Sequence, residues 1–82
     1  MRLRTVEENG VKKRVRKRLE TLDASEVLRW ADMTSVAVGQ NVNEIRKSLA
    51  HDDVDQAKAY MEETRNGAWA LLAAMDALKL KV

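Results

Sequence analysis

Six lysines and arginines fall within seven consecutive residues near the start of the chain. On a helix, so many cations would release counterions on meeting nucleic acid, which makes the run a candidate phosphate-binding element. No aromatic side chain interrupts the run to stack on bases, so we expect phosphate contacts without sequence selectivity. A solvated helix face, an acidic surface of the same chain, an acidic partner or an anionic membrane are the alternatives. The candidate polyanion-binding residues are Lys12, Lys13, Arg14, Arg16, Lys17 and Arg18.

Two tryptophans form a second candidate site. Both lie off the main apolar stripe of the helix that contains them, and tryptophan is over-represented where proteins bind one another. They are expected either to lie in the core beneath the N-terminal helix or to anchor a subunit or partner interface. The candidate interface residues are Val27, Trp30, Tyr60, Trp69 and Leu72.

The residues needed for catalysis or metal binding are sparse. One histidine (His51) and no cysteine leave a single chain without the ligands of a zinc site. The acidic cluster Asp52–Asp55 lacks the glycine and the downstream glutamate of a calcium loop, and it is expected to cap a helix instead. Neither a serine-nucleophile motif nor a phosphate-binding glycine loop is present. We therefore expect a non-enzymatic protein with no catalytic residue, no metal and no cofactor.

Length and charge limit the architecture that could carry these sites. The 82 residues allow one small domain, whose stability as a monomer would be marginal. Residues 1–18 carry eight basic side chains against two acidic ones, whereas the rest of the chain is mildly acidic. No apolar run is long enough to span a membrane and no secretory signal is evident, so we expect a cytoplasmic protein.

The basic run lies on the first of three expected helices. Val11, Val15, Leu19 and Leu22 recur at helical spacing, which predicts a short helix at about 10–22. Residues 1–9 are expected to be flexible or briefly extended, and residues 10–82 to form a single helical domain.

Two longer stripes predict helices at about 24–50 and 53–80. Asp23 and Asp53 stand three residues before Glu26 and Gln56, the spacing of a capping box. Gly39 would allow close approach of another backbone. The apolar stripes repeat at steps of three and four: Leu28, Ala31, Ser35, Val38, Val42, Ile45 and Leu49 in one helix, and Val54, Ala57, Met61, Thr64, Ala68, Leu71, Met75, Leu78 and Val82 in the other.

Two such helices joined by a short turn predict an all-α fold based on an antiparallel helical hairpin. Pairing Leu49 with Val54 would place Val42 against Met61, and Val38 against Thr64 or Arg65. The short first helix cannot cover the apolar residues left over, so we expect self-association, as a homodimer, to complete the bundle. Two functions follow: binding of a protein partner through the tryptophan-bearing flank, or non-specific nucleic-acid binding through residues 12–18.

Overall fold

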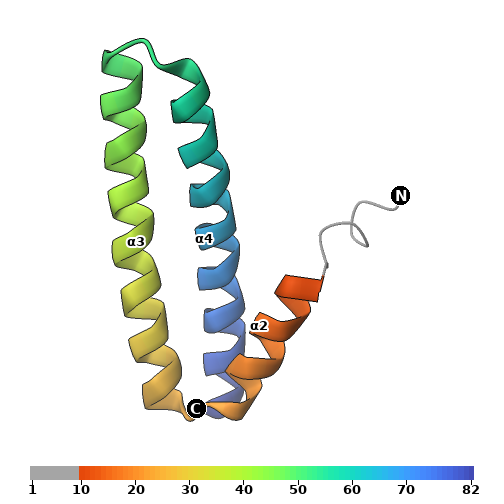
Figure 1. The fold of residues 1–82 in the computed structure, drawn as a ribbon. Helices are drawn as coiled ribbons and strands as arrows, with labels where there is room; N and C mark the ends of the chain where they lie inside the picture. The colour runs from red at the N-terminus through yellow and green to blue at the C-terminus, as the bar shows by residue number, and fades with distance from the viewer. Residues whose placement is uncertain (1–9) are drawn as a thin grey trace.

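The computed structural model describes residues 10–82, and within this range its only regular secondary structure is helical, without strands. The helices are α2 (Gly10–Thr21), α3 (Ala24–Ala50) and α4 (Val54–Lys81) (Figure 1). This confirms the all-α prediction, and each helix begins and ends within about one residue of its expected position. The expectation for residues 1–9 falls outside the described residues.

Local hydrogen bonds explain where the long helices begin. The Asp23 carboxylate accepts from the Glu26 backbone N–H, and the Glu26 carboxylate accepts from the Asp23 N–H, both at 2.9 Å. This is the capping box that the sequence predicts. The first of these bonds, helped by the Ser25 hydroxyl, holds the pKa of Asp23 below its ordinary value of 3.8. At α4, the Asp53 carboxylate accepts from the Gln56 N–H at 3.2 Å.

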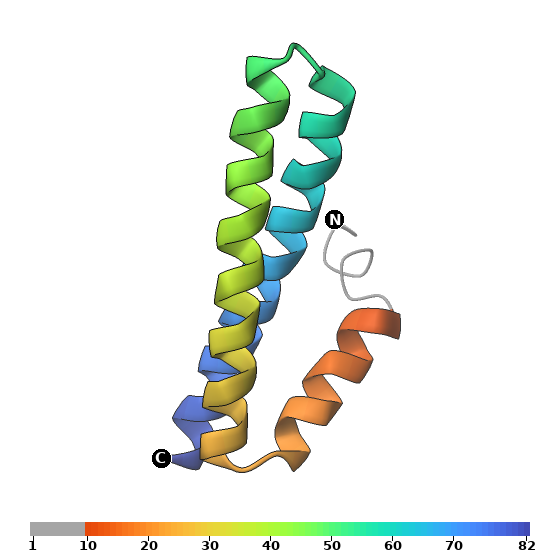
Figure 2. The same cartoon turned by 60° about the vertical axis from the view of Figure 1, so that its left-hand side comes forward.

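The helices are arranged as a long pair with a shorter helix on one side. α3 and α4 lie side by side and run in opposite directions, joined by a tight turn in which Asp52 adopts a positive φ of 59° (Figure 1). α2 lies against the C-terminal half of α4 and diverges from the pair toward its own N-terminus (Figure 2). The Lys81 ammonium donates to the Glu20 backbone carbonyl at 3.0 Å, tying the ends of α4 and α2 together.

Half of the predicted stripe on α3 does not face α4, which is a correction to the expected packing. Leu28 is 56% exposed, whereas its neighbour Val27 is completely buried; likewise Leu49 is exposed and Ser48 is buried. Ala31, Val38 and Ile45 keep their expected inward positions, buried or half-buried. At every second position of the predicted stripe, the residue that packs against α4 is therefore the one immediately before the predicted residue.

The same rotation occurs on α4. Ala57 and Ala74 are completely buried, whereas Met61 and Met75 are each 39% exposed. Val38 consequently packs against Gly67, two to three residues beyond the expected Thr64 or Arg65. Small residues at the contact let the two backbones approach closely, and this outweighs the larger side chains that the sequence pattern favours.

The core is concentrated where α2 meets the long pair. Leu19, Val27, Ala31 and Ala74 form one buried cluster, and seven half-buried apolar residues pack around it. These surrounding residues are Val15, Leu22, Trp30, Leu71, Ala73, Ala77 and Leu78. α2 thus contributes its apolar stripe to the core and leaves its remaining faces for other contacts.

Candidate interaction surfaces

Two of the predicted polyanion-binding cations contact an aromatic ring of their own chain. The Lys12 Nζ lies 5.1 Å from the centre of the Trp69 ring, and the Arg16 Cζ lies 5.6 Å from it. At these distances the ring quadrupole attracts both cations. Trp69 therefore contributes to holding α2 on α4, and much of its ring is occupied by the chain itself.

The other four cations form what we call the basic face of α2: Lys13, Arg14, Lys17 and Arg18. All four side chains are exposed, and none forms an ion pair within the described part of the chain. Lys13 lies one helical turn from Lys17, and Arg14 one turn from Arg18, so the four project from one side of the helix. Of the six predicted polyanion-binding residues, Lys12 and Arg16 therefore contact Trp69, and the other four are accessible.

A groove separates α2 from α3 on the side of Trp30. Its volume is about 210 Å³, and it is lined by Val11, Arg14, Val15, Arg18, Leu19 and Trp30. Small-molecule pockets typically measure about 300–1,000 Å³, so this groove is better matched to one or two side chains of a protein partner. Its lining is apolar except for the two arginines of the basic face.

The five predicted interface residues do not form one surface. Val27 is a correction: it is completely buried in the core cluster beneath α2, so no partner can reach it. Trp30 is half-buried, with one side against that cluster and one side on the groove. Tyr60 is half-buried, whereas Leu72 is 66% exposed.

Trp69 and Leu72 share a second, more polar hollow on the outer side of α4. It measures about 420 Å³ and includes Lys12, Glu62 and Arg65 in its lining. Because both signs of charge border this hollow, it has no evident preference for a cationic or an anionic ligand. The groove beside Trp30 has the clearer preference, for an anionic ligand, because its only charged lining residues are two arginines.

A third surface was missed in the sequence because its residues were assigned to the helix contact. We call it the open face. Its large apolar side chains are between 39% and 56% exposed. They are Leu28, Val42 and Leu49 on α3, and Val54, Met61 and Met75 on α4.

The chemistry of the remaining polar residues is modest. His51 is exposed and ends α3, where its backbone N–H donates to the carbonyls of Lys47 and Ser48. Among residues 10–82, no three His, Cys, Asp or Glu side chains gather as metal ligands would. In the same range, no helix combines the length and the hydropathy that crossing a membrane requires.

No family model, no curated protein and no solved structure matches this chain.

Proposed function

We propose that this protein is a non-enzymatic interaction protein that binds an acidic amphipathic helix of a partner protein. The binding site is the groove between α2 and α3. The observation that carries the proposal is the combination of an apolar floor at Val15, Leu19 and Trp30 with two arginines at its border that form no ion pair within residues 10–82.

The groove fits the two kinds of contact that such a helix makes. An apolar side chain of the partner would insert beside Trp30, in a volume suited to one or two anchors. Carboxylates one turn apart on the partner would bind Arg14 and Arg18, because a guanidinium pairs with a carboxylate in a bidentate manner. The partially buried ring of Trp30 is already held in place by the core cluster, so little side-chain freedom would be lost on binding.

One specific observation favours a second function, non-specific binding to duplex nucleic acid. The four residues of the basic face are all exposed and make no ion pair within residues 10–82. Each would be free to neutralise a phosphate and release a counterion. This function would use the whole basic face and would have no need of the groove.

Two double variants distinguish these functions, because each removes two charges from the same helix. Arg14→Gln/Arg18→Gln changes the border of the groove, whereas Lys13→Gln/Lys17→Gln changes the basic face beyond it. The probes are a synthetic helix with leucines along one side and glutamates elsewhere, and a mixed-sequence DNA duplex. In a Trp69→Phe background, Trp30 fluorescence reports occupation of the groove.

For the proposed function, we expect the arginine variant to weaken peptide binding at least tenfold and the lysine variant to have a much smaller effect; two lost bidentate pairs are worth about that much. Equal effects of the two variants on the peptide, or no peptide binding at about 50 mM salt, would overturn the groove assignment. For nucleic acid, both variants would instead reduce the salt dependence by a similar amount, about two counterions each.

A further inference from the structure

The open face lies on the opposite side of the α3–α4 pair from α2. Leu28 and Leu49 each follow directly after a residue buried against α4, and Met61 and Met75 each follow one that faces α3. One residue further along a helix turns a side chain by about 100°. Because α3 and α4 are antiparallel, this rotation of about 100° away from the helix contact moves the named side chains of α3 and those of α4 to the same side of the pair. The residues that contact α2, such as Ala73 and Ala77, come one position before an inward residue and so lie on the other side.

The area of the open face is too large to be left to solvent in a chain with so small a core. From the exposed fractions, its six large side chains present roughly 500 Å² of apolar surface, more than half of the about 800 Å² that each partner contributes to a standard interface. By contrast, only five apolar residues are fully buried in the described part of the chain, and three of them are alanines. If the chain needs its open face covered in order to be stable, the molecule that covers it must be present whenever the chain is. A second copy of the same chain meets that condition.

We propose that two copies pair through their open faces, with α3 crossing α3 of the second copy in antiparallel orientation near Gly39. The sequence along this side of α3 is complementary to its own reverse. A two-fold axis at Gly39 places Leu28 within one residue of the position opposite Leu49 of the second copy, and Ser35 within one residue of the position opposite Val42 of the second copy. It also places Asp32, seven residues before Gly39, opposite Arg46, seven residues after it.

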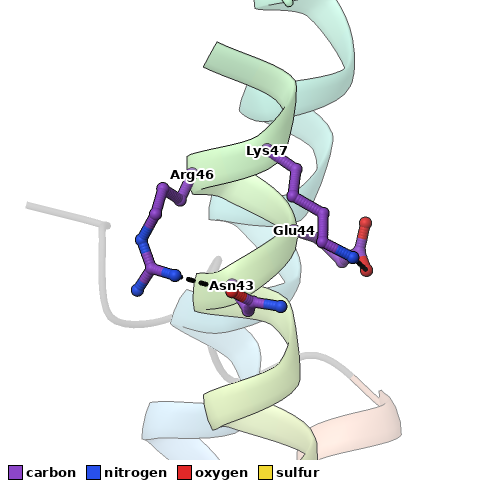
Figure 3. Close-up of polar contacts among 4 residues, drawn as sticks. All are labelled: Asn43, Glu44, Arg46 and Lys47. Carbon is purple, nitrogen blue, oxygen red and sulfur yellow. Dashed lines mark hydrogen bonds and ion pairs between the residues drawn. The ribbon is translucent and has the colours of Figure 1, made fainter. Parts of the chain in front are cut away.

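The polar groups at these positions are available for that pairing. The Asp32 carboxylate has no ion-pair or hydrogen-bond partner in the described residues, and its backbone carbonyl accepts from the Ser35 hydroxyl at 2.7 Å. Among the described residues, the Arg46 guanidinium donates only to the neutral Asn43 amide, at 2.6 Å. Figure 3 shows Arg46 and Asn43 on one side of α3, apart from the Lys47–Glu44 ion pair.

Gly39 supplies the space at the crossing point. A glycine within a helix costs about 1 kcal/mol relative to alanine. Nothing in the described chain lies within 4 Å of the position that a Cβ atom on Gly39 would take, so packing within one copy gives no reason for a glycine there. Close approach of two α3 backbones would give one.

Charge reversal tests the register. Light scattering and sedimentation should show a dimer at micromolar concentration. Asp32→Arg and Arg46→Asp should each raise the dissociation constant by about tenfold or more, because each places two like-charge pairs in the symmetric interface. An equimolar mixture of the two variants should dimerise again, since opposite charges then meet. The matched control is Lys47→Asp, the same reversal one residue away on the other side of α3, which should leave dimerisation unchanged.

Disulfide trapping tests the orientation without perturbing the core, because the natural chain has no cysteine. Gly39→Cys lies at the proposed axis and should form a disulfide-linked dimer under mild oxidation, whereas Leu28→Cys should not. Rapid cross-linking of Leu28→Cys would indicate parallel helices and overturn the arrangement. A wild-type chain that is monomeric at about 100 μM, a concentration at which a standard-size interface should be occupied, would overturn the proposal altogether.

Discussion

Gly67 of α4 lies so close to Val38 of α3 that a Cβ atom on Gly67 would stand 2.5 Å from the Val38 Cγ2. No side chain larger than hydrogen fits at this point without movement of the valine. Gly39, where the sequence predicts that another backbone can approach, has open space beside it within the described chain. The two long helices therefore approach closely at Gly67, and α4 continues through the Asn66-Gly67 step without interruption.

Gly67→Ala should therefore destabilise the protein by about 1 kcal/mol, although alanine is the better helix former. Overpacking typically costs about 1–3 kcal/mol, which outweighs the gain of about 1 kcal/mol in helix propensity. Urea unfolding measures the difference. In a Val38→Ala background the clash is removed, so the same Gly67→Ala change should become stabilising. A destabilisation of equal size in both backgrounds would contradict the proposed contact.

The neighbours Val27 and Leu28 test which side of α3 belongs to the core. Val27→Ala should cost about 2–3 kcal/mol, because Val27 is completely buried and its methyl groups have no other place to pack. Leu28→Ala removes more atoms, yet below the concentration at which the chain dimerises it should cost less than half as much, because Leu28 is 56% exposed in a single copy. Unfolding should be measured at two chain concentrations: dilution should reduce the Leu28→Ala effect and leave the Val27→Ala effect unchanged. Equal losses of unfolding free energy in the two variants would indicate that Leu28 belongs to the core, as the sequence predicts.

A double-mutant cycle between Lys12 and Trp69 should give a coupling free energy of about 0.5–1 kcal/mol, the range for an exposed cation–π contact. The single changes are Lys12→Gln and Trp69→Leu, and thermal unfolding supplies each corner of the cycle. Lys13→Gln serves as the control, since Lys13 projects into solvent one residue away and should show no coupling to Trp69.

The capping box predicts a specific dependence of stability on pH. The pKa of Asp23 is lower in the folded chain than its ordinary value of 3.8, chiefly because the Glu26 N–H donates to the ionised carboxylate. Its contribution is therefore complete above that ordinary value and is lost as the pH falls through the lower, folded-state pKa. The midpoint of thermal unfolding should decrease over this acidic range. Asp23→Asn keeps a capping oxygen without the charge, so it should show a smaller decrease, whereas a decrease equal to that of the wild type would exclude Asp23 as the cause.

The positions of the helices could be read from the sequence because the signals are local. Asp23 with Glu26 and Asp53 with Gln56 fix the starts of α3 and α4 through hydrogen bonds that span three residues. The apolar repeat within each segment then determines the helical class, and the basic character of α2 follows from composition alone.

The rotation of the helices was decided only in the tertiary structure. Val27 and Leu28 belong to two stripes one residue apart, and both stripes repeat at helical spacing. The choice between them depends on how closely Gly67 and Ala74 let the backbones approach, and on which side α2 covers. The same holds for Trp69, whose ring meets Lys12 across more than fifty residues of sequence. Such contacts depend on the relative placement of whole helices, which a periodicity within one helix does not encode.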